Sequence, residues 1–323
     1  MIVTVTFNPS LDEHIMVEGL VLEETNRWVR RHRYAGGKGI DVSRAIHEMG
    51  GVSIAYGFIG GANGRTVEIL LDEEGVPFSF TPIKQETRTN FIITDTKTNQ
   101  QTRIGAPGPH ISRAELERFL NKMIKIRPSP ELLVVGGSVP PGVPDSIYYD
   151  IVMEAKGFGV GTILDAEGRW LEEGIKAKPY LIKPNVHETE ELLGRELPTE
   201  EAITEAALEL VKVGIEIVVI SRGKEGIIAA TKGSILKAVA PSVKVRSTVG
   251  AGDCTVAGLA LKLAYGEPLT EACRLAVAVS TACVLTTGTE LCHKADVERL
   301  LSQIKVWEIT ARQRNKVFFT ANG

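Results

Sequence analysis

The stretch STVGAGDCTVAGLALKLA, residues 247–264, carries the strongest local signal in this 323-residue sequence. Its second part, residues 254–264, is apolar nearly all round, which is typical of a helix buried inside a domain. In front of that helix, Gly250 and Gly252 allow backbone conformations that side chains would obstruct, so the amide N–H groups of the turn can point at one spot. These N–H groups predict an anion site, and Asp253 on the first turn is a candidate general base beside it. An ordinary helix start, with an aspartate favoured by the helix dipole, is the alternative.

Short apolar runs recur along the chain and predict strands with helices between them. The helical pattern is clearest at residues 41–49 and 113–126, and a capping box of Ser112 and Glu115 opens the second of these. Strands that alternate with helices indicate an α/β fold, with a three-layer α/β/α body and a mostly parallel central sheet that places ligands at the carboxyl ends of its strands. The predicted strands are residues 3–7, 54–58, 132–135, 161–164, 180–182, 217–220 and 227–230.

Composition and charge are those of an ordinary globular protein. Hydrophobic residues make up 43% and charged residues 24% of the chain, which excludes disordered, collagen-like and coiled-coil proteins. The net charge of -3 provides no basic field that would favour nucleic acid or an anionic membrane. The apolar runs are shorter than a bilayer span, the first residues lack a secretory signal pattern, and the four cysteines lack zinc-like spacing. We therefore expect a cytoplasmic protein with reduced cysteines and with no nucleic-acid or membrane partner.

Two polar, β-tending segments interrupt the alternation, at residues 11–34 and 86–105. A small β-sheet inserted into the body would produce this pattern, and such a sheet could cover an active site as a lid. A pair of surface loops is the alternative. The expected organisation is an α/β body of residues 1–11, 35–85 and 106–304, a β lid of residues 12–34 and 86–105, and a C-terminal tail of residues 305–323.

Two further motifs offer groups that bind phosphate or metal. The segment AGGKGID, residues 35–41, is a glycine cluster that leads into a helix with Asp41 at the predicted N-cap, and it suits a polyol or a phosphate. The segment KPNVHE, residues 183–188, follows a predicted strand. Its Asn185 and Glu188 can hold a hydrated Mg²⁺ and nucleotide phosphates. Taken alone, the first motif is also a tight strand-to-helix turn and the second is a weak pattern, while the P-loop and the dinucleotide-binding fingerprint are both missing from the sequence.

Together these motifs resemble the PfkB, or ribokinase-like, family of carbohydrate kinases. The resemblance runs from about residue 2 to residue 301 and depends on two separated signatures, residues 36–45 and 248–253. It implies a ribokinase-like fold and an ATP- and Mg²⁺-dependent transfer of a phosphoryl group to a sugar hydroxyl. Shorter motifs resemble the branch that contains 1-phosphofructokinase, tagatose-6-phosphate kinase and the PfkB-type 6-phosphofructokinase; they lie at residues 8–12, 87–90, 107–108, 136–142 and 183–185.

The resemblance also implies roles for individual residues. Asp253 is similar to the catalytic base, and Gly250, Ala251 and Gly252 are similar to the anion hole for the transferred phosphoryl group. A guanidinium fork suits a phosphate remote from the reacting hydroxyl, which supports a role for Arg88. Positions similar to those that bind the sugar phosphate are Asp12, Arg27, Gly36, Gly37, Lys38, Asp41, Arg88, Asn90, Arg103 and Ser138. Positions similar to those that bind ATP are Lys183, Asn185, Ser221, Gly223 and Thr248, with Glu188 and Asn185 at the metal.

Some departures from the family pattern divide the substrate prediction. Asp41 stands where the family usually has Asn, which adds a charge to the sugar site. Thr25 stands where the PfkB-type 6-phosphofructokinases have Lys, and residues 24–27 look more like those of 1-phosphofructokinase and tagatose-6-phosphate kinase. In contrast, residues 249–254 and 287–292 look closest to the 6-phosphofructokinase branch.

The favoured function is 6-phosphofructokinase activity, with 1-phosphofructokinase and tagatose-6-phosphate kinase as alternatives. A non-catalytic sugar- or nucleotide-binding regulator on the same fold is a rival from another class, and Asp253 together with Asn185 and Glu188 speaks against it. A Rossmann-type oxidoreductase that uses residues 250–252 is a second rival. The exposed edges of a β lid would be protected by pairing, so we expect a homodimer with clasped lids.

Overall fold

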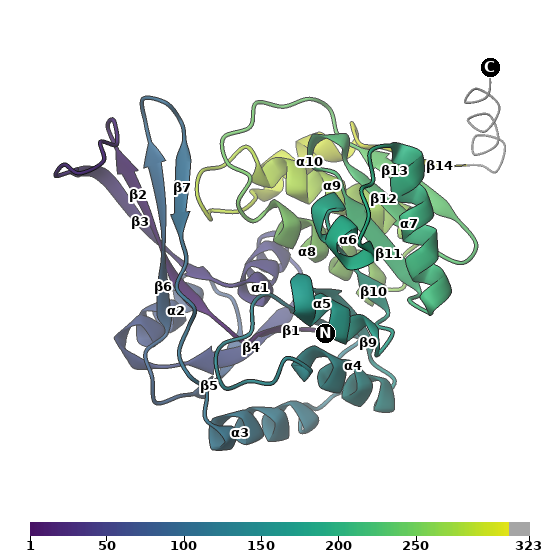
Figure 1. Ribbon diagram of the computed structural model, residues 1–323, viewed down its shortest axis with the longest axis horizontal. Helices are drawn as coiled ribbons and strands as arrows, with labels where there is room; N and C mark the ends of the chain where they lie inside the picture. The colour runs from purple at the N-terminus through teal and green to yellow at the C-terminus, as the bar shows by residue number, and fades with distance from the viewer. Residues whose placement is uncertain (310–323) are drawn as a thin grey trace.

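The computed structural model describes residues 1–309 and consists of an α/β body with a small sheet at one end (Figure 1). The body is built on a ten-stranded sheet. In spatial order its strands are β14 (Lys305–Glu308), β13 (Ile235–Val239), β12 (Ile227–Ala230), β11 (Ile217–Ser221), β10 (Leu181–Ile182), β9 (Gly161–Asp165), β8 (Leu132–Gly136), β1 (Ile2–Thr6), β4 (Ser53–Ile59) and β5 (Phe78–Pro82). Neighbours from β11 to β5 pair in parallel, whereas β12, β13 and β14 are added in antiparallel pairs.

Helices cover both faces of this sheet, as the alternation along β1 shows. Ile2 packs into one hydrophobic cluster and Val3 and Val5 pack into the other, because successive side chains of a strand point to opposite faces. One face carries α1 (Lys38–Glu48), α8 (Ala251–Ala264), α9 (Leu269–Cys283) and α10 (Lys294–Leu301). The other carries α3 (Arg113–Ile124), α4 (Ile147–Gly157), α5 (Gly168–Ile175), α6 (Val186–Leu193) and α7 (Glu200–Val213). A 3₁₀ turn spans Gly223–Glu225, and α2 (Gly61–Glu73) packs beside β4 and β5 in a third cluster.

Helix α8 lies inside its layer, between α1 and α9. Its residues from Cys254 to Leu261 are all buried, which explains why the helix has apolar residues on every side. Gly258 permits the close approach of α9, since a Cβ at that position would collide with the backbone of Ala276. The interior packing fixes the start of α8, and therefore the turn before it.

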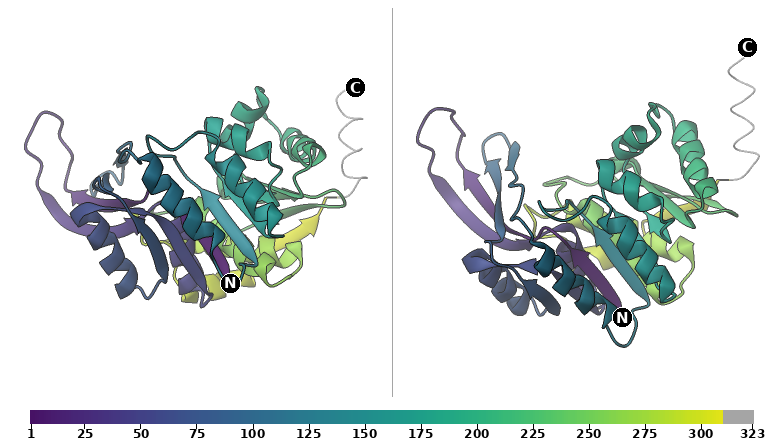
Figure 2. Two further views of the ribbon diagram at one scale, coloured as in Figure 1. Left: turned by 90° about the horizontal axis from the view of Figure 1, so that it is seen from below. Right: turned by 60° about the horizontal axis from the view of Figure 1, so that its bottom comes forward.

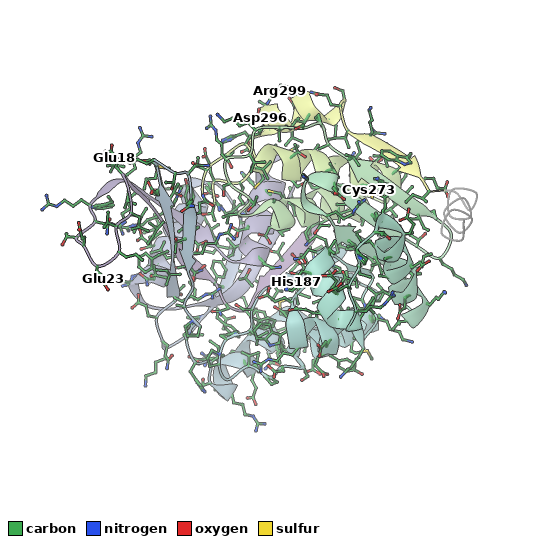
Figure 3. The ribbon with its side chains drawn as sticks, turned by 45° about the horizontal axis from the view of Figure 1, so that its top comes forward. Glu18, Glu23, His187, Cys273, Asp296 and Arg299 are labelled. Atoms are coloured by element: carbon green, nitrogen blue, oxygen red, sulfur yellow. The ribbon has the colours of Figure 1, made fainter. Side chains whose placement is uncertain are left out.

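The small sheet contains β3 (Trp28–Gly36), β2 (Ser10–Val17), β6 (Arg88–Asp95) and β7 (Gln101–Ile104), in that order. The central pair, β2 and β6, is parallel, and the two outer pairs are antiparallel. This sheet projects from the body (Figure 2), and Glu18 and Glu23 mark its outer end (Figure 3). The predicted inserted β-sheet is therefore confirmed, and the alternative of two surface loops is wrong.

Each predicted strand of the body forms, but the predicted tail begins too early. Residues 305–308 are β14, which pairs with β13 and closes an edge of the main sheet that would otherwise expose backbone groups. The rest of that segment, residues 310–323, lies outside the described residues. The four cysteines are buried and unpaired. Within residues 1–309 the structure contains no helix with the length and apolar character needed to span a membrane.

Candidate active site

A cavity of about 400 Å³ lies between the carboxyl ends of body strands and the small sheet. Its lining comes from β1, β2, β6, β7, β8 and the start of α1. Of the predicted sugar-phosphate residues, Asp12, Gly37, Lys38, Asp41, Arg88, Asn90, Arg103 and Ser138 line it. Gly36 lies directly behind the lining, since a Cβ there would collide with the Asp12 carboxylate. Arg27 lies in the exposed segment between β2 and β3 and does not line the cavity.

Asp12 is held in the cavity wall by two side chains. The hydroxyl of Ser10 donates to Asp12 Oδ1 at 2.7 Å, and Nδ2 of Asn90 donates to the same oxygen at 3.0 Å. Burial raises the pKa of Asp12, although these two hydrogen bonds oppose that shift. The carboxylate is thus preoriented by its neighbours, and its second oxygen can accept a hydrogen bond from a ligand hydroxyl.

Asp41 occupies a different place from the one that the sequence predicts. Helix α1 begins at Lys38 with Gly37 as its N-cap, so Asp41 lies within the first turn and not at the N-cap. The helix begins earlier than predicted because the chain changes direction at Gly37. This residue has φ of +118°, a conformation that glycine adopts readily and aspartate rarely. Asp41 Oδ1 accepts from Nη1 of Arg44 at 3.2 Å. Burial and then the charge of Asp253 hold the pKa of Asp41 well above its usual value.

Arg88 and Asn8 join the small sheet to the loops of the body. Arg88 donates from Nη1 to the carbonyl of Ala106 at 2.7 Å and from Nη2 to the carbonyl of Asn8 at 2.9 Å. Nδ2 of Asn8 donates in turn to the hydroxyl of Ser138 at 3.1 Å. Arg103 lines the same cavity from β7 and is exposed. The guanidinium of Arg88 is therefore fixed in direction by two backbone carbonyls.

A buried carboxylate that the sequence reasoning missed connects the sugar cavity to the predicted ATP site. Asp165, the last residue of β9, pairs through Oδ1 with Nζ of Lys38 at 3.1 Å and with Nζ of Lys183 at 3.3 Å. Burial alone would raise the pKa of Asp165, but the two ammonium groups lower it. The carboxylate therefore stays charged and holds two cations at one point. A charged residue directly after an apolar strand was the available signal for Asp165.

Asp253 lies beside these charges on the first turn of α8. Gly250, with φ of +79°, caps the helix without a side-chain hydrogen bond, and the N–H of Cys254 donates to the carbonyl of Gly250 at 2.8 Å. The N–H of Ala251 donates to the carbonyl of Thr248 at 3.5 Å, and the N–H groups of Gly252 and Asp253 follow it in the first turn, where an anion can accept their hydrogen bonds. Burial raises the pKa of Asp253 to about 7, against the opposing charge of Lys38.

The predicted ATP residues lie at or after the ends of β10 and β11 or precede the start of α8. A Cβ on Gly252 would lie 3.5 Å from Nζ of Lys183, so this ammonium group faces the turn. Asn185 and Ser221 form an isolated bridge between the ends of β10 and β11. Gly223 follows in the exposed 3₁₀ turn, and Thr248 is exposed just before Gly250. Of the predicted ATP residues, Lys183 and Thr248 are thus placed at the start of α8, whereas Asn185 and Ser221 are joined to each other.

Asn185 and Glu188 form a capping box at the start of α6. Oδ1 of Asn185 accepts the N–H of Glu188, and Oε2 of Glu188 accepts the N–H of Asn185, both at 2.8 Å. Residues 1–309 contain no cluster of three or more His, Cys, Asp or Glu side chains that could hold a metal ion. The second oxygen of the Glu188 carboxylate is the kind of ligand that a hydrated Mg²⁺ takes together with nucleotide phosphates.

Two further cavity residues, Thr6 and Glu167, lie outside every motif that the sequence singled out. Ser10 and Gly136 also line the cavity and belong to the motifs at residues 8–12 and 136–142. Thr6 ends β1, and Glu167 lies just past the end of β9. Their residue types occur throughout the chain, so only the meeting of the two sheets distinguishes them.

Comparison with known proteins agrees with this geometry. The family described as pfkB family carbohydrate kinase matches residues 5–296. A 1-phosphofructokinase of Borreliella burgdorferi is 34% identical and covers 96% of this chain and 99% of its own. An ATP-dependent 6-phosphofructokinase isozyme 2 of Mycobacterium tuberculosis is 36% identical and covers 92% of this chain and 88% of its own.

A solved structure supports the same assignment. Phosphofructokinase-2 from Escherichia coli in complex with fructose-6-phosphate is 32% identical, with a TM-score of 0.88, and the match covers 93% of this chain and 98% of that one. The fold is thus ribokinase-like, as predicted. The two relatives are sugar-phosphate kinases, which transfer a phosphoryl group to an alcohol. This chain belongs to the PfkB family of carbohydrate kinases and is a phosphofructokinase-type, ATP-using sugar kinase.

Proposed function

We propose that this enzyme transfers the γ-phosphoryl group of ATP to the C1 hydroxyl of fructose 6-phosphate, which yields fructose 1,6-bisphosphate and ADP. The observation that carries the proposal is that the cavity is lined both by cations and by groups that hydrogen-bond hydroxyls. Arg88 and Arg103 offer cations for a sugar phosphate, while Asp12, Asp41 and Asn90 offer hydrogen-bonding groups for hydroxyls. A phosphosugar needs both kinds of group.

Asp253 would accept the proton of the attacking hydroxyl. Its pKa of about 7 suits a general base near neutral pH. Lys38 and Lys183, both held at Asp165, place positive charge beside this base, where negative charge develops during transfer. Mg²⁺ held with the ATP phosphates near Asn185 and Glu188 would neutralise further charge. The protein therefore contributes alignment and charge neutralisation.

The alternatives are 1-phosphofructokinase and tagatose-6-phosphate kinase activity, which the residues around Thr25 favour. A panel of fructose 6-phosphate, fructose 1-phosphate, tagatose 6-phosphate and free fructose, scored by ADP release, separates them. We expect the highest kcat/KM for fructose 6-phosphate. If kcat/KM is higher for another phosphosugar, that sugar is the substrate in place of fructose 6-phosphate. If no sugar in the panel causes ADP release, the kinase role is refuted.

Arg88 provides a test of the phosphate site. We expect Arg88→Ala to raise the KM for the sugar phosphate by roughly tenfold to a hundredfold, as for loss of a charge-assisted contact, with little change in the KM for ATP. Arg118→Ala, which removes an exposed arginine on α3 in the body, is the control. Equal increases in both KM values for Arg88→Ala would remove this residue from the phosphate site.

The small sheet would act as a lid and as a dimer contact. It exposes several large apolar side chains, namely Leu22, Trp28, Val29, Phe91 and Ile104, and its outer strands have free edges. Two such sheets clasped together would bury these groups and bring Arg27, which lies outside its own cavity, near the paired copy. Light scattering should therefore give about twice the 35.0 kDa chain mass, and a single-chain mass would contradict the dimer.

A further inference from the structure

His14 connects the small sheet to a loop of the body that lies outside the cavity. It follows Asp12 by two residues on β2, so both side chains leave the same face of the strand. Asp12 lines the cavity, whereas the fully buried imidazole of His14 lies against Gly288. Gly288 belongs to the α9–α10 loop, residues 284–293, and has φ of +61°. A Cβ on Gly288 would collide with the imidazole ring.

The α9–α10 loop continues from this contact to the turn at the start of α8, residues 247–253, which we call the anion-hole turn. The side chain of Leu291 lies so close to Gly250 that a Cβ on Gly250 would collide with it. Nη1 of Arg44 donates to the carbonyl of Thr289 at 2.9 Å and thereby fixes the loop between its two ends. The loop is thus packed against His14 on one side and against the N-cap of α8 on the other.

A chain of hydrogen bonds joins the same two places by a second route. Nε2 of His14 is 2.9 Å from the hydroxyl of Thr94, which also accepts from Nε2 of Gln101 at 3.3 Å. The hydroxyl of Ser247 is within 3.4 Å of Oε1 of Gln101 and accepts the N–H of Val249 at 3.2 Å. This route runs from β2 through β6 and β7 to the residue before Gly250. Both routes therefore begin at His14 and end at the anion-hole turn.

The buried ring is costly, which argues that its contacts matter. Nδ1 of His14 is buried and has no hydrogen-bond partner within the part of the chain that the structure describes. A buried polar group without a partner lowers the stability of the folded chain. An apolar side chain could fill this space without that cost, but it could not make the Nε2 contact to Thr94.

We propose that His14 is a positioning residue, which holds the anion-hole turn, residues 247–253, in register with the sugar cavity through the α9–α10 loop and through Thr94, Gln101 and Ser247. The inference rests on the proposed function, in which Asp253 and the turn must align with a sugar held by Asp12. Phosphoryl transfer depends on alignment, and a misplacement of about 1 Å can cost roughly a hundredfold in rate.

The kinetic test is His14→Ala, measured with fructose 6-phosphate. We expect kcat to fall about tenfold to a hundredfold, while the KM for the sugar phosphate changes less than about threefold. His14→Gln, which can restore a contact from its ε-nitrogen to Thr94, should recover most of the loss. The matched control is His32→Ala, because His32 is the exposed cross-strand partner of His14 on β3; this variant should retain wild-type kcat. Unchanged kcat in His14→Ala, or equal losses in both variants, would overturn the proposal.

Amide hydrogen exchange tests the positioning without activity. His14→Ala should speed exchange of the peptide that contains residues 247–253, and His32→Ala should leave it unchanged. If His14→Ala fails to fold, Ser247→Ala cuts the hydrogen-bond route at its far end and should speed the same peptide's exchange and lower kcat. Unchanged exchange in these variants rejects the positioning role. If the wild type releases no ADP with any phosphosugar, the proposed function fails, while the exchange result still decides the role of His14.

Discussion

The starts of α6 and α8 lie on neighbouring sides of the predicted ATP site and are built in opposite ways. The N-cap of α6 is Asn185, whose side chain and Glu188 satisfy each other's backbone N–H groups. The N-cap of α8 is Gly250, which has no side chain to satisfy the N–H groups behind it. A capped start stabilises its own helix, whereas an uncapped glycine start leaves donors for an anion.

The two starts also differ in their surroundings. Asp253, on the first turn of α8, is close enough to Lys38, Asp165 and Lys183 for all three charges to influence its pKa. Burial has the largest effect and raises that pKa to about 7. The start of α8 therefore combines unsatisfied backbone donors with charges from other elements, whereas the start of α6 satisfies its own donors.

Removing the carboxylate of α8 should have the largest effect. We expect Asp253→Asn to lower kcat by at least about a hundredfold with sugar-phosphate binding largely retained, since a general base contributes roughly 10²–10⁴ in rate. Asp296→Asn, on the first turn of α10, is the control, because that helix start lies outside the cavity. If Asp253→Asn keeps wild-type turnover, the start of α8 has no catalytic role that distinguishes it from the start of α6.

The glycine cap of α8 comes next. Gly250→Ala places a methyl group against Leu291 at φ of +79°, so we expect kcat to fall about tenfold or more through displacement of the turn. Gly266→Ala is the matched control: it has φ of +69° at the other end of α8, and its Cβ would meet no atom within 4 Å. Steady-state kinetics and thermal unfolding of both variants separate backbone strain from the effect at the site. Equal kcat in the two variants would contradict the role of Gly250.

The pH dependence of the wild type should follow Asp253. A base is active only when deprotonated, so kcat/KM should fall about tenfold per pH unit below about 7 and level off above it. The linkage to stability has the opposite sign. Because the folded pKa is raised above 3.8, this group's stabilising contribution is complete below 3.8 and is lost as pH rises through about 7. Asp253→Asn should therefore be at least as stable as the wild type at pH 8, and a lower Tm there would contradict the burial of this charge.

The cap of α6 should give the smallest effect. Asn185→Ala should cost about 1 kcal/mol of stability as a lost N-cap, and it should also raise the KM for ATP about threefold if Asn185 holds the hydrated metal. Thr199→Ala is the control, because Thr199 caps α7 by accepting the N–H of Ala202. We expect it to cost a similar amount of stability with no change in the KM for ATP. If the KM for ATP is the same in both variants, Asn185 acts only as a helix cap and does not hold the metal.

Much of the site could be predicted because its signals are local. The glycine turns before α1 and α8 and the Asn185–Glu188 pair each lie within a few residues, so the sequence shows the helix start and its ligands together. Even so, the N-cap of α1 is Gly37 and not Asp41. Gly37 has φ of +118°, so its backbone is not helical and the helix begins directly after it. The short strand β14 was missed because its only evidence is the partner strand β13.

By itself, the sequence determined the alternation of strands and helices, the inserted β segments and three candidate motifs for binding phosphate or metal. These depend on periodicity and on conformational preferences of neighbouring residues, which are short-range properties. Only the tertiary structure decided that Asp165 joins Lys38 to Lys183, that Arg27 lies away from its own cavity, and that His14 meets Gly288. Those contacts join residues that are distant in the chain. Charge pairing and packing between distant residues produce no regular spacing in the sequence, so the sequence alone does not predict them.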